Sequence, residues 1–184
     1  YATKGKEVQG KGPIVILLDE SGSMGDAKKD VWSKAIALAI TNRATKERRS
    51  VHIITFSKQI RSEVTIKPQT KTAEQIQKAL DRKCEGGTDF DKPIKRACEI
   101  LKSLPLMKQA DVLMITDGEQ NLSEETVRQA KELTETSKVS WLIVGIGENA
   151  IKVISETIGK IGTSIYQVKS TDNTDSVANI VALR

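Results

Sequence analysis

Apolar residues along this chain alternate between short continuous runs and longer segments with helical spacing. Continuous runs of about four to eight residues are typical of strands buried on both faces of a parallel sheet. Such a strand is expected at Ile14–Asp19, and further strands are expected at Val51–Ser57, Ala110–Thr116, Val139–Ile146 and Ser164–Lys169. A further strand, Glu63–Lys67, follows the second strand after a gap that suits a hairpin and is too short for a helical crossover. We therefore expect this pair to be antiparallel and to lie at a sheet edge.

Segments with helical spacing fill the gaps between these strands. Helices are expected at Asp26–Thr45, Thr72–Lys83, Asp91–Ser103, Ser123–Ser137, Ala150–Lys160 and Asp175–Leu183. The first helix carries an apolar stripe that we expect to face the core, made of Val31, Ala35, Leu38 and Ala39. The third carries the equivalent stripe Ile94, Ala97, Cys98 and Leu101. Ser123 precedes two acidic residues, a pattern typical of a helix N-terminus.

The alternation of strands and helices indicates βαβ units and a mostly parallel sheet with helices on both faces. The expected fold class is α/β, with a doubly wound six-stranded sheet in the order 3-2-1-4-5-6 and the third strand as an antiparallel edge. In such sheets, ligands bind outside the carboxyl ends of the strands where the strand order reverses. Because the first and fourth strands flank that point, functional residues are expected just after Leu18 and just after Thr116.

The length and composition of the chain are those of one globular domain. Of its 184 residues, 12–184 are expected to form the domain, and the polar, basic residues 1–11 are expected to be a linker or tail from a longer chain. No apolar run approaches the roughly 20 residues that span a bilayer. The net charge of +5 favours acidic partners, but 3% aromatic residues offer no stacking platform for nucleic acid bases. Cys84 and Cys98 are too few for a disulfide framework, and reduced thiols favour the cytoplasm.

Oxygen-bearing side chains gather after the first and fourth strands and in a loop before the third helix. They comprise two carboxylates and three hydroxyls, namely Asp19, Ser21, Ser23, Thr88 and Asp117. Oxygen ligands of this kind suit Mg²⁺, Mn²⁺ or Ca²⁺, and suit Zn²⁺ or Cu²⁺ poorly. Because the two carboxylates balance a divalent ion, an external carboxylate still meets a Lewis-acidic metal. We therefore expect a metal site, with Mg²⁺ preferred, that can accept a further ligand.

Three short motifs carry these residues in order along the chain: DESGSM at Asp19–Met24, GGTD at Gly86–Asp89 and ITDG at Ile115–Gly118. Together they resemble the metal-ion-dependent adhesion site of von Willebrand factor A domains, and the resemblance extends over nearly the whole chain from Gly12. Each motif alone has a plainer interpretation as a helix cap or a turn. Their convergence on one expected crevice favours metal binding.

The resemblance implies a role for each candidate ligand. Ser21 and Ser23 would bind the metal through their hydroxyls, and Thr88 would bind it in a conformation-dependent way. Asp19 and Asp117 would act directly or through waters. Partners of the family typically supply an Asp or Glu, which completes the metal's coordination.

A finer resemblance is to bacterial cytoplasmic members of the ViaA or CoxE kind. It is carried by the lead-in GKGPIVILLDESGSM and by the GGTDF segment. It implies that this domain belongs to a longer chain and that its protein partner is a MoxR-type AAA+ ATPase or a client of one. Glu20 departs from this group, which often has a small or polar residue at that position.

The main alternative is an enzyme, a Mg²⁺-dependent phosphohydrolase with Asp19 as nucleophile. Such enzymes usually place a second Asp two residues later as general acid. Here that position is Ser21, whose hydroxyl cannot do this proton transfer near neutral pH. The chain has no GxxxxGK[ST] phosphate loop, and its single histidine, His52, lies inside an expected strand. We therefore expect a binding module and no enzymatic activity.

Overall fold

A six-stranded sheet forms the centre of the computed structural model, which describes residues 12–68, 73–104, 109–118, 120–147, 150–161 and 164–169. The strands are β1 (Ile14–Asp19), β2 (Val51–Phe56), β3 (Ile60–Ile66), β4 (Asp111–Thr116), β5 (Ser140–Ile146) and β6 (Ser164–Val168). They lie in the order β3-β2-β1-β4-β5-β6, and only the β2–β3 pair is antiparallel. The order and the antiparallel edge confirm the fold that the sequence predicts.

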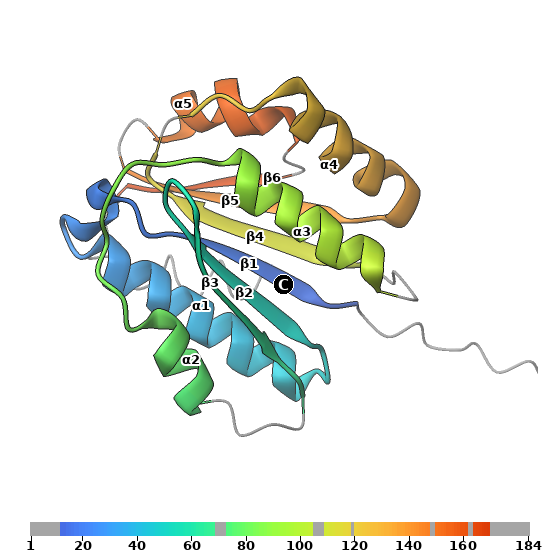
Figure 1. Ribbon diagram of the computed structural model, residues 1–184, viewed down its shortest axis with the longest axis horizontal. Helices are drawn as coiled ribbons and strands as arrows, with labels where there is room; N and C mark the ends of the chain where they lie inside the picture. The colour runs from blue at the N-terminus through green and yellow to red at the C-terminus, as the bar shows by residue number, and fades with distance from the viewer. Residues whose placement is uncertain are drawn as a thin grey trace, which may run out of the picture.

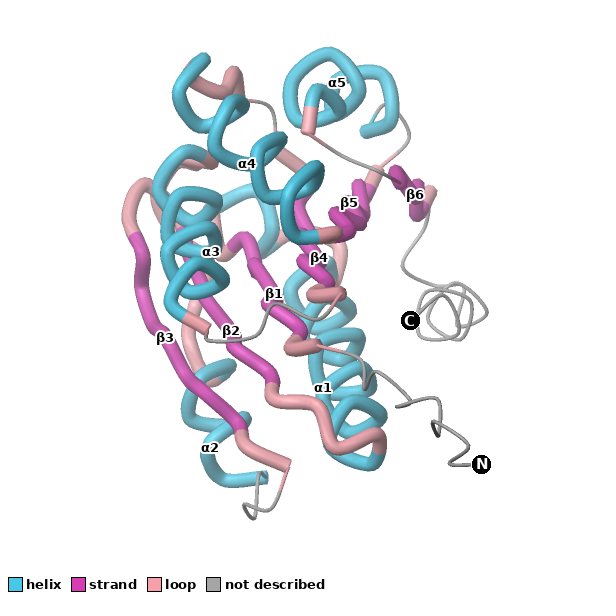
Figure 2. Tube along the Cα trace, turned by 90° about the vertical axis from the view of Figure 1, so that its right-hand side faces the viewer, coloured by secondary structure: helices cyan, strands magenta, loops and turns pink. Residues whose placement is uncertain are grey.

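Helices cover both faces of the sheet (Figure 1). They are α1 (Lys29–Lys46), α2 (Ala73–Leu80), α3 (Asp91–Ser103), α4 (Glu124–Ser137) and α5 (Ala150–Thr157), with short 3-10 helices at Gly22–Gly25 and Ile158–Lys160. Figure 2 shows α1 and α2 on one face and α3, α4 and α5 on the other. No helix in the described ranges is long and apolar enough to cross a membrane. The expected helix Asp175–Leu183 and the expected tail 1–11 lie outside the described residues.

The central strand β1 is buried along its whole length. Val15 and Leu17 join the core beneath α3, α4 and α5, whereas Ile16 and Leu18 join the core beneath α1 and α2. Because successive side chains of a strand point to opposite faces, a strand covered on both sides must be apolar at every position. This double burial explains the continuous apolar run in the sequence.

The prediction for the face that α1 buries is wrong. Val31 is 62% exposed and Leu38 is 41% exposed, so the predicted stripe of Val31, Ala35, Leu38 and Ala39 points away from the core. The buried stripe lies one position later and is made of Trp32, Ile36, Ala37 and Ile40. Both stripes are apolar, but the one with Trp32 removes more apolar area from water, and this decides the rotation of the helix.

Two other local predictions are confirmed, and some boundaries move. The α3 stripe of Ile94, Ala97, Cys98 and Leu101 is buried. Ser123 is the N-cap of α4, and its hydroxyl accepts a hydrogen bond from the Thr126 amide. The strand β3 begins at Ile60 and not at Glu63. The sequence pattern missed its first residues because they are half-buried edge positions without apolar alternation. The helix α1 begins at Lys29 and not at Asp26, because the preceding residues form a 3-10 turn and a left-handed bend.

Candidate functional site

The candidate site lies at the carboxyl ends of β1 and β4. These strands are parallel neighbours, and Leu18 pairs with Ile115, so Asp19 and Asp117 emerge side by side. From β1 the chain runs through α1 to β2 on one side, whereas β4 pairs with β1 on the other side. Doubly wound sheets form their ligand-binding crevice at such a reversal of strand order.

Asp19 is the buried acid of the site, and its side chain is held at both oxygens. One oxygen, Oδ1, accepts a hydrogen bond of 2.8 Å from the Ser21 amide, and Oδ2 accepts one of 2.5 Å from the Thr116 hydroxyl. Burial raises the pKa of Asp19, and the bonds from Thr116 and Ser21 oppose this rise. Thr116 was not among the predicted site residues. Its place at the end of a strand, one residue before Asp117, is the signal that would have identified it.

Ser21, Ser23 and Asp117 form a chain of polar contacts beside Asp19. The hydroxyls of Ser21 and Ser23 lie 3.3 Å apart. The Ser23 hydroxyl donates a hydrogen bond of 2.9 Å to Asp117 Oδ1. Ser23 does not cap α1, because the N-cap position is Lys28, whose side chain makes no capping bond. The Ser23 hydroxyl bonds Asp117 instead.

Thr88 reaches the same point from a separate loop. A Cβ atom placed on Gly118 would lie 3.4 Å from Thr88 Oγ1, 3.4 Å from Asp19 Oδ2 and 3.3 Å from Thr116 Oγ1. These oxygens therefore surround the position that a Cβ atom of residue 118 would take, and glycine leaves that space open. The neighbouring Asp89 has the capping role that the sequence allowed, because its Oδ1 accepts bonds from the amides of Asp91 and Lys92 at the start of α3.

Backbone hydrogen bonds hold the loop that carries Thr88 against the loop after β1. The Glu85 amide donates to the Glu20 carbonyl, and the Gly22 amide donates to the Gly86 carbonyl, each over 2.9 Å. Gly86 has a φ of +80°, a left-handed conformation that favours glycine. The two loops therefore form one structural unit at this end of the sheet.

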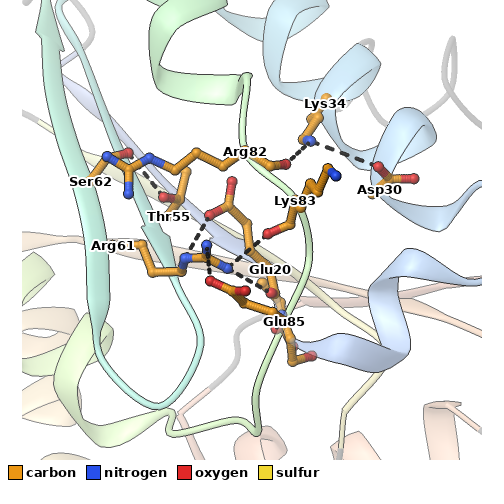
Figure 3. Close-up of polar contacts among 11 residues, drawn as sticks. Glu20, Asp30, Lys34, Thr55, Arg61, Ser62, Arg82, Lys83 and Glu85 are labelled. Carbon is orange, nitrogen blue, oxygen red and sulfur yellow. Dashed lines mark hydrogen bonds and ion pairs between the residues drawn. The ribbon is translucent and has the colours of Figure 1, made fainter.

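Arg61 of β3 reinforces this junction (Figure 3). Its Nη1 donates to the Lys83 carbonyl over 2.9 Å, and its Nη2 donates to Glu85 Oε1 over 2.9 Å. Its Nε lies 3.5 Å from Oε2 of Glu20, whose side chain is only 2% exposed. Burial raises the pKa of Glu20, while the Thr55 hydroxyl and the Arg61 guanidinium act to lower it. Nothing in the sequence motif pointed to Arg61, which lies on a different strand.

Lys29, at the start of α1, places a positive charge on the candidate ligands. Its Nζ lies 2.6 Å from Asp117 Oδ2 and 3.3 Å from the Ser23 carbonyl oxygen. The Asp117 side chain is 4% exposed and that of Lys29 is 23% exposed. Sequence reasoning missed this ion pair, because the two residues are far apart in the chain and belong to different elements.

The structure brings together the five side chains that the sequence singled out as candidate metal ligands. Hydrogen bonds connect Asp19, Ser21, Ser23 and Asp117 in one cluster, and Thr88 lies beside Asp19 across Gly118. Within the described ranges, no three His, Cys, Asp or Glu side chains gather as a metal-ligating group, so the hydroxyls must contribute to any cation site here. Carboxylates and hydroxyls with no nitrogen or sulfur fit a hard cation such as Mg²⁺.

The sheet topology and the clustered side chains together define a doubly wound α/β domain with an oxygen-lined site at the reversal of strand order. A family model of the von Willebrand factor type A domain matches residues 14–120. The chain therefore belongs to the von Willebrand factor type A domain family.

Relatives of known sequence include proteins from archaea and bacteria. An uncharacterized protein of Methanocaldococcus jannaschii is 34% identical over 165 residues, which are 88% of this chain and 37% of that protein. The regulatory protein ViaA of Edwardsiella ictaluri is 34% identical over 120 residues, 64% of this chain and 24% of ViaA. The chain thus spans well under half the length of either relative.

Solved structures share the fold at low sequence identity. A von Willebrand factor type A structure from Catenulispora acidiphila has a TM-score of 0.72 and 16% identity, over 94% of this chain and 42% of that one. Proximal thread matrix protein 1 from the mussel byssus, with a MIDAS motif occupied by zinc, has a TM-score of 0.65 and 19% identity, over 94% of this chain and 46% of that one.

Proposed function

We propose that this chain is a Mg²⁺-dependent protein-binding module, in which an Asp or Glu of a partner completes the coordination of the metal. The ligands would be Asp19, Ser21, Ser23, Thr88 and Asp117. The observation that carries this proposal is the convergence of their oxygens from three loops at the ends of β1 and β4. The metal-occupied MIDAS motif of the mussel protein supports it, because that protein shares the fold.

The residues around the ligands would hold them in position before any partner arrives. Thr116 and the Ser21 amide each bond one oxygen of Asp19, so its carboxylate has a defined orientation in a buried setting. The bond from the Ser23 hydroxyl orients Asp117 in the same way. A bound Mg²⁺ would supply a Lewis-acidic point for an external carboxylate. The protein's own contribution is therefore a preorganised set of oxygens with only two negative charges.

The kinship with ViaA supports a protein partner, because the bacterial relatives are named as regulatory proteins. We propose a MoxR-type AAA+ ATPase or its client as that partner, in the cytoplasm, with this chain acting as the adaptor. The ATPase class follows from the resemblance to ViaA- and CoxE-like proteins. The same names support a binding role and not an enzymatic one.

Thermal unfolding with and without millimolar Mg²⁺ tests the metal site. A cation that binds only the folded chain raises the melting temperature, and the increase grows with concentration. We expect this increase in the wild type and in the control Ser103→Ala, which removes an exposed hydroxyl at the far end of α3. We expect it to vanish in Asp19→Ala and to shrink in Ser21→Ala/Ser23→Ala. Equal increases in all four proteins would overturn the proposed site.

Retention of partners from a cell extract tests the binding role. Proteins held by the wild type in Mg²⁺ should be released by EDTA and should not bind Ser21→Ala/Ser23→Ala, whose fold is checked by circular dichroism. Replacing one Asp or Glu of the retained partner by Asn or Gln should remove most of the affinity. Full retention in EDTA, or turnover of a phosphate ester that disappears in Asp19→Asn, would contradict the proposal.

A further inference from the structure

Lys29 occupies a position that the metal-binding role alone does not explain. Its ammonium lies against Asp117 Oδ2 at 2.6 Å and against the Ser23 carbonyl oxygen at 3.3 Å. Asp117 uses its other oxygen to accept the hydroxyl of Ser23. One protein cation therefore already neutralises a carboxylate that belongs to the proposed ligand set.

A divalent cation among these oxygens would share Asp117 with the ammonium. Like charges a few ångströms apart repel strongly where the surroundings are partly buried, and the Asp117 side chain is only 4% exposed. The carboxylate carries a single charge, so it cannot fully compensate both cations. Metal binding therefore requires the ammonium to move away or to weaken its contact.

The Lys29 side chain can move its ammonium away from Asp117. Its ammonium is a compact charge on a flexible stem, and it is already 23% exposed, so it can regain water by rotating outward. Its anchor on the backbone is separate from this contact, because the Lys29 amide donates to the Asp26 carbonyl at the start of α1. Moving the ammonium thus leaves the helix in place.

We propose that Lys29 is a built-in competitor of the metal: its ammonium occupies Asp117, is displaced when Mg²⁺ binds, and so sets the concentration at which the site fills. This inference rests on the proposed metal-binding function. Removing a residue that supports the site would weaken metal binding. Removing the charge of Lys29 should instead strengthen it.

Calorimetric titration of the purified chain with MgCl₂ at constant ionic strength tests the proposal. Lys29→Met keeps most of the stem and removes the charge. We expect its Kd for Mg²⁺ to fall about tenfold or more, the scale of one charge-assisted hydrogen bond. The control is Lys28→Met, which removes an exposed charge one residue away and should change Kd by less than about threefold. Lys29→Arg provides the reverse test, because a guanidinium can hold the carboxylate by two bonds and should leave the Kd unchanged or raise it.

Stability without metal gives a second readout. In EDTA, Lys29→Met should melt below the wild type, because Asp117 loses its counter-charge, and saturating Mg²⁺ should remove most of that difference. A Kd for Lys29→Met that equals or exceeds the wild-type value, alongside a wild-type site that depends on Asp19, would overturn the competitor role alone. No Mg²⁺ binding by any of these proteins would overturn both the competitor role and the proposed function. If Lys29→Met does not fold, Lys29→Gln serves the same comparison.

Discussion

The buried pair of Glu20 and Arg61 leads to a quantitative prediction about stability. Arg61→Met keeps much of the aliphatic stem but removes the guanidinium that lies 3.5 Å from the Glu20 carboxylate. It also removes the hydrogen bond to the Lys83 carbonyl and the contact with Glu85, whose side chain is 75% exposed. The change therefore leaves Glu20, at 2% exposure, as a buried acid without its nearest positive neighbour, while Lys34 and Arg82 still favour its charged form.

The expected cost follows from these contacts taken in turn. The bond to the Lys83 carbonyl is charge-assisted and contributes about 1.5–3 kcal/mol. The exposed contact with Glu85 contributes less than about 1 kcal/mol. Loss of one partner of a buried pair costs about 3–5 kcal/mol, and proton uptake by Glu20, which burial favours by raising its pKa, reduces this cost to about 1–3 kcal/mol. We expect Arg61→Met to lower the free energy of unfolding at pH 7 by about 3–7 kcal/mol in total.

A double-mutant cycle isolates the part that belongs to the pair. Glu20→Gln removes the buried charge and should change stability by less than about 1 kcal/mol, because the hydrogen bonds of Arg61 to the loop remain. Glu20→Gln/Arg61→Met should be more stable than Arg61→Met alone. Urea unfolding in EDTA measures all four proteins. Additive effects within about 0.5 kcal/mol would refute the buried pair as the source of the loss.

Three further predictions concern the helix, the loop and the pH dependence. Ile36→Ala should destabilise the chain by about 2–5 kcal/mol and Leu38→Ala by less than about 1 kcal/mol in urea unfolding, since only Ile36 is buried; equal losses would contradict the rotation of α1. Thr88→Ala should weaken Mg²⁺ binding in calorimetry while leaving unfolding in EDTA almost unchanged, and a stability loss without an affinity loss would make it a structural residue. Burial lowers the pKa of His52, with Glu63 opposing, so the stability linked to it is complete above the ordinary histidine pKa and is lost as pH falls through the folded value. Urea unfolding of His52→Gln from pH 7 to pH 5 should therefore show a shallower decline than the wild type, and an identical slope would contradict this.

The strands, and the meeting of the candidate ligands at one edge of the sheet, could be predicted because local patterns determine them. A strand segment covered on both faces, such as residues 14–18, must be apolar throughout, and side chains at the ends of adjacent parallel strands must meet. The rotation of α1 could not be predicted in this way, because two apolar stripes one position apart satisfy the same periodicity. Only packing against the sheet distinguishes Trp32 from Val31.

The residues that surround the ligands were not predictable, because their roles depend on contacts between distant elements. Lys29 meets Asp117 through the left-handed bend at Ala27 and Lys28, which periodicity does not report. Arg61 meets Glu20 only because the β2–β3 hairpin lies beside the loop after β1. A motif in one sequence identifies the candidate ligands and leaves out the residues from other elements that contact them.

The acids at the carboxyl ends of β1 and β4 differ in how they are neutralised, and under the proposed function this difference determines which of them would bind a cation. Glu20 has an arginine that also holds the neighbouring loop through two hydrogen bonds, so releasing Glu20 would disrupt several contacts at once. Asp117 has a single lysine on a flexible stem, and Asp19 has hydrogen-bond donors but no counter-ion within ion-pair distance among the described residues. Under the proposed function, a divalent cation would use Asp19 and Asp117, whose two charges would match its own once the Lys29 ammonium moves away. Glu20, although it lies between Asp19 and Ser21 in the sequence, remains bound to the structure behind the site.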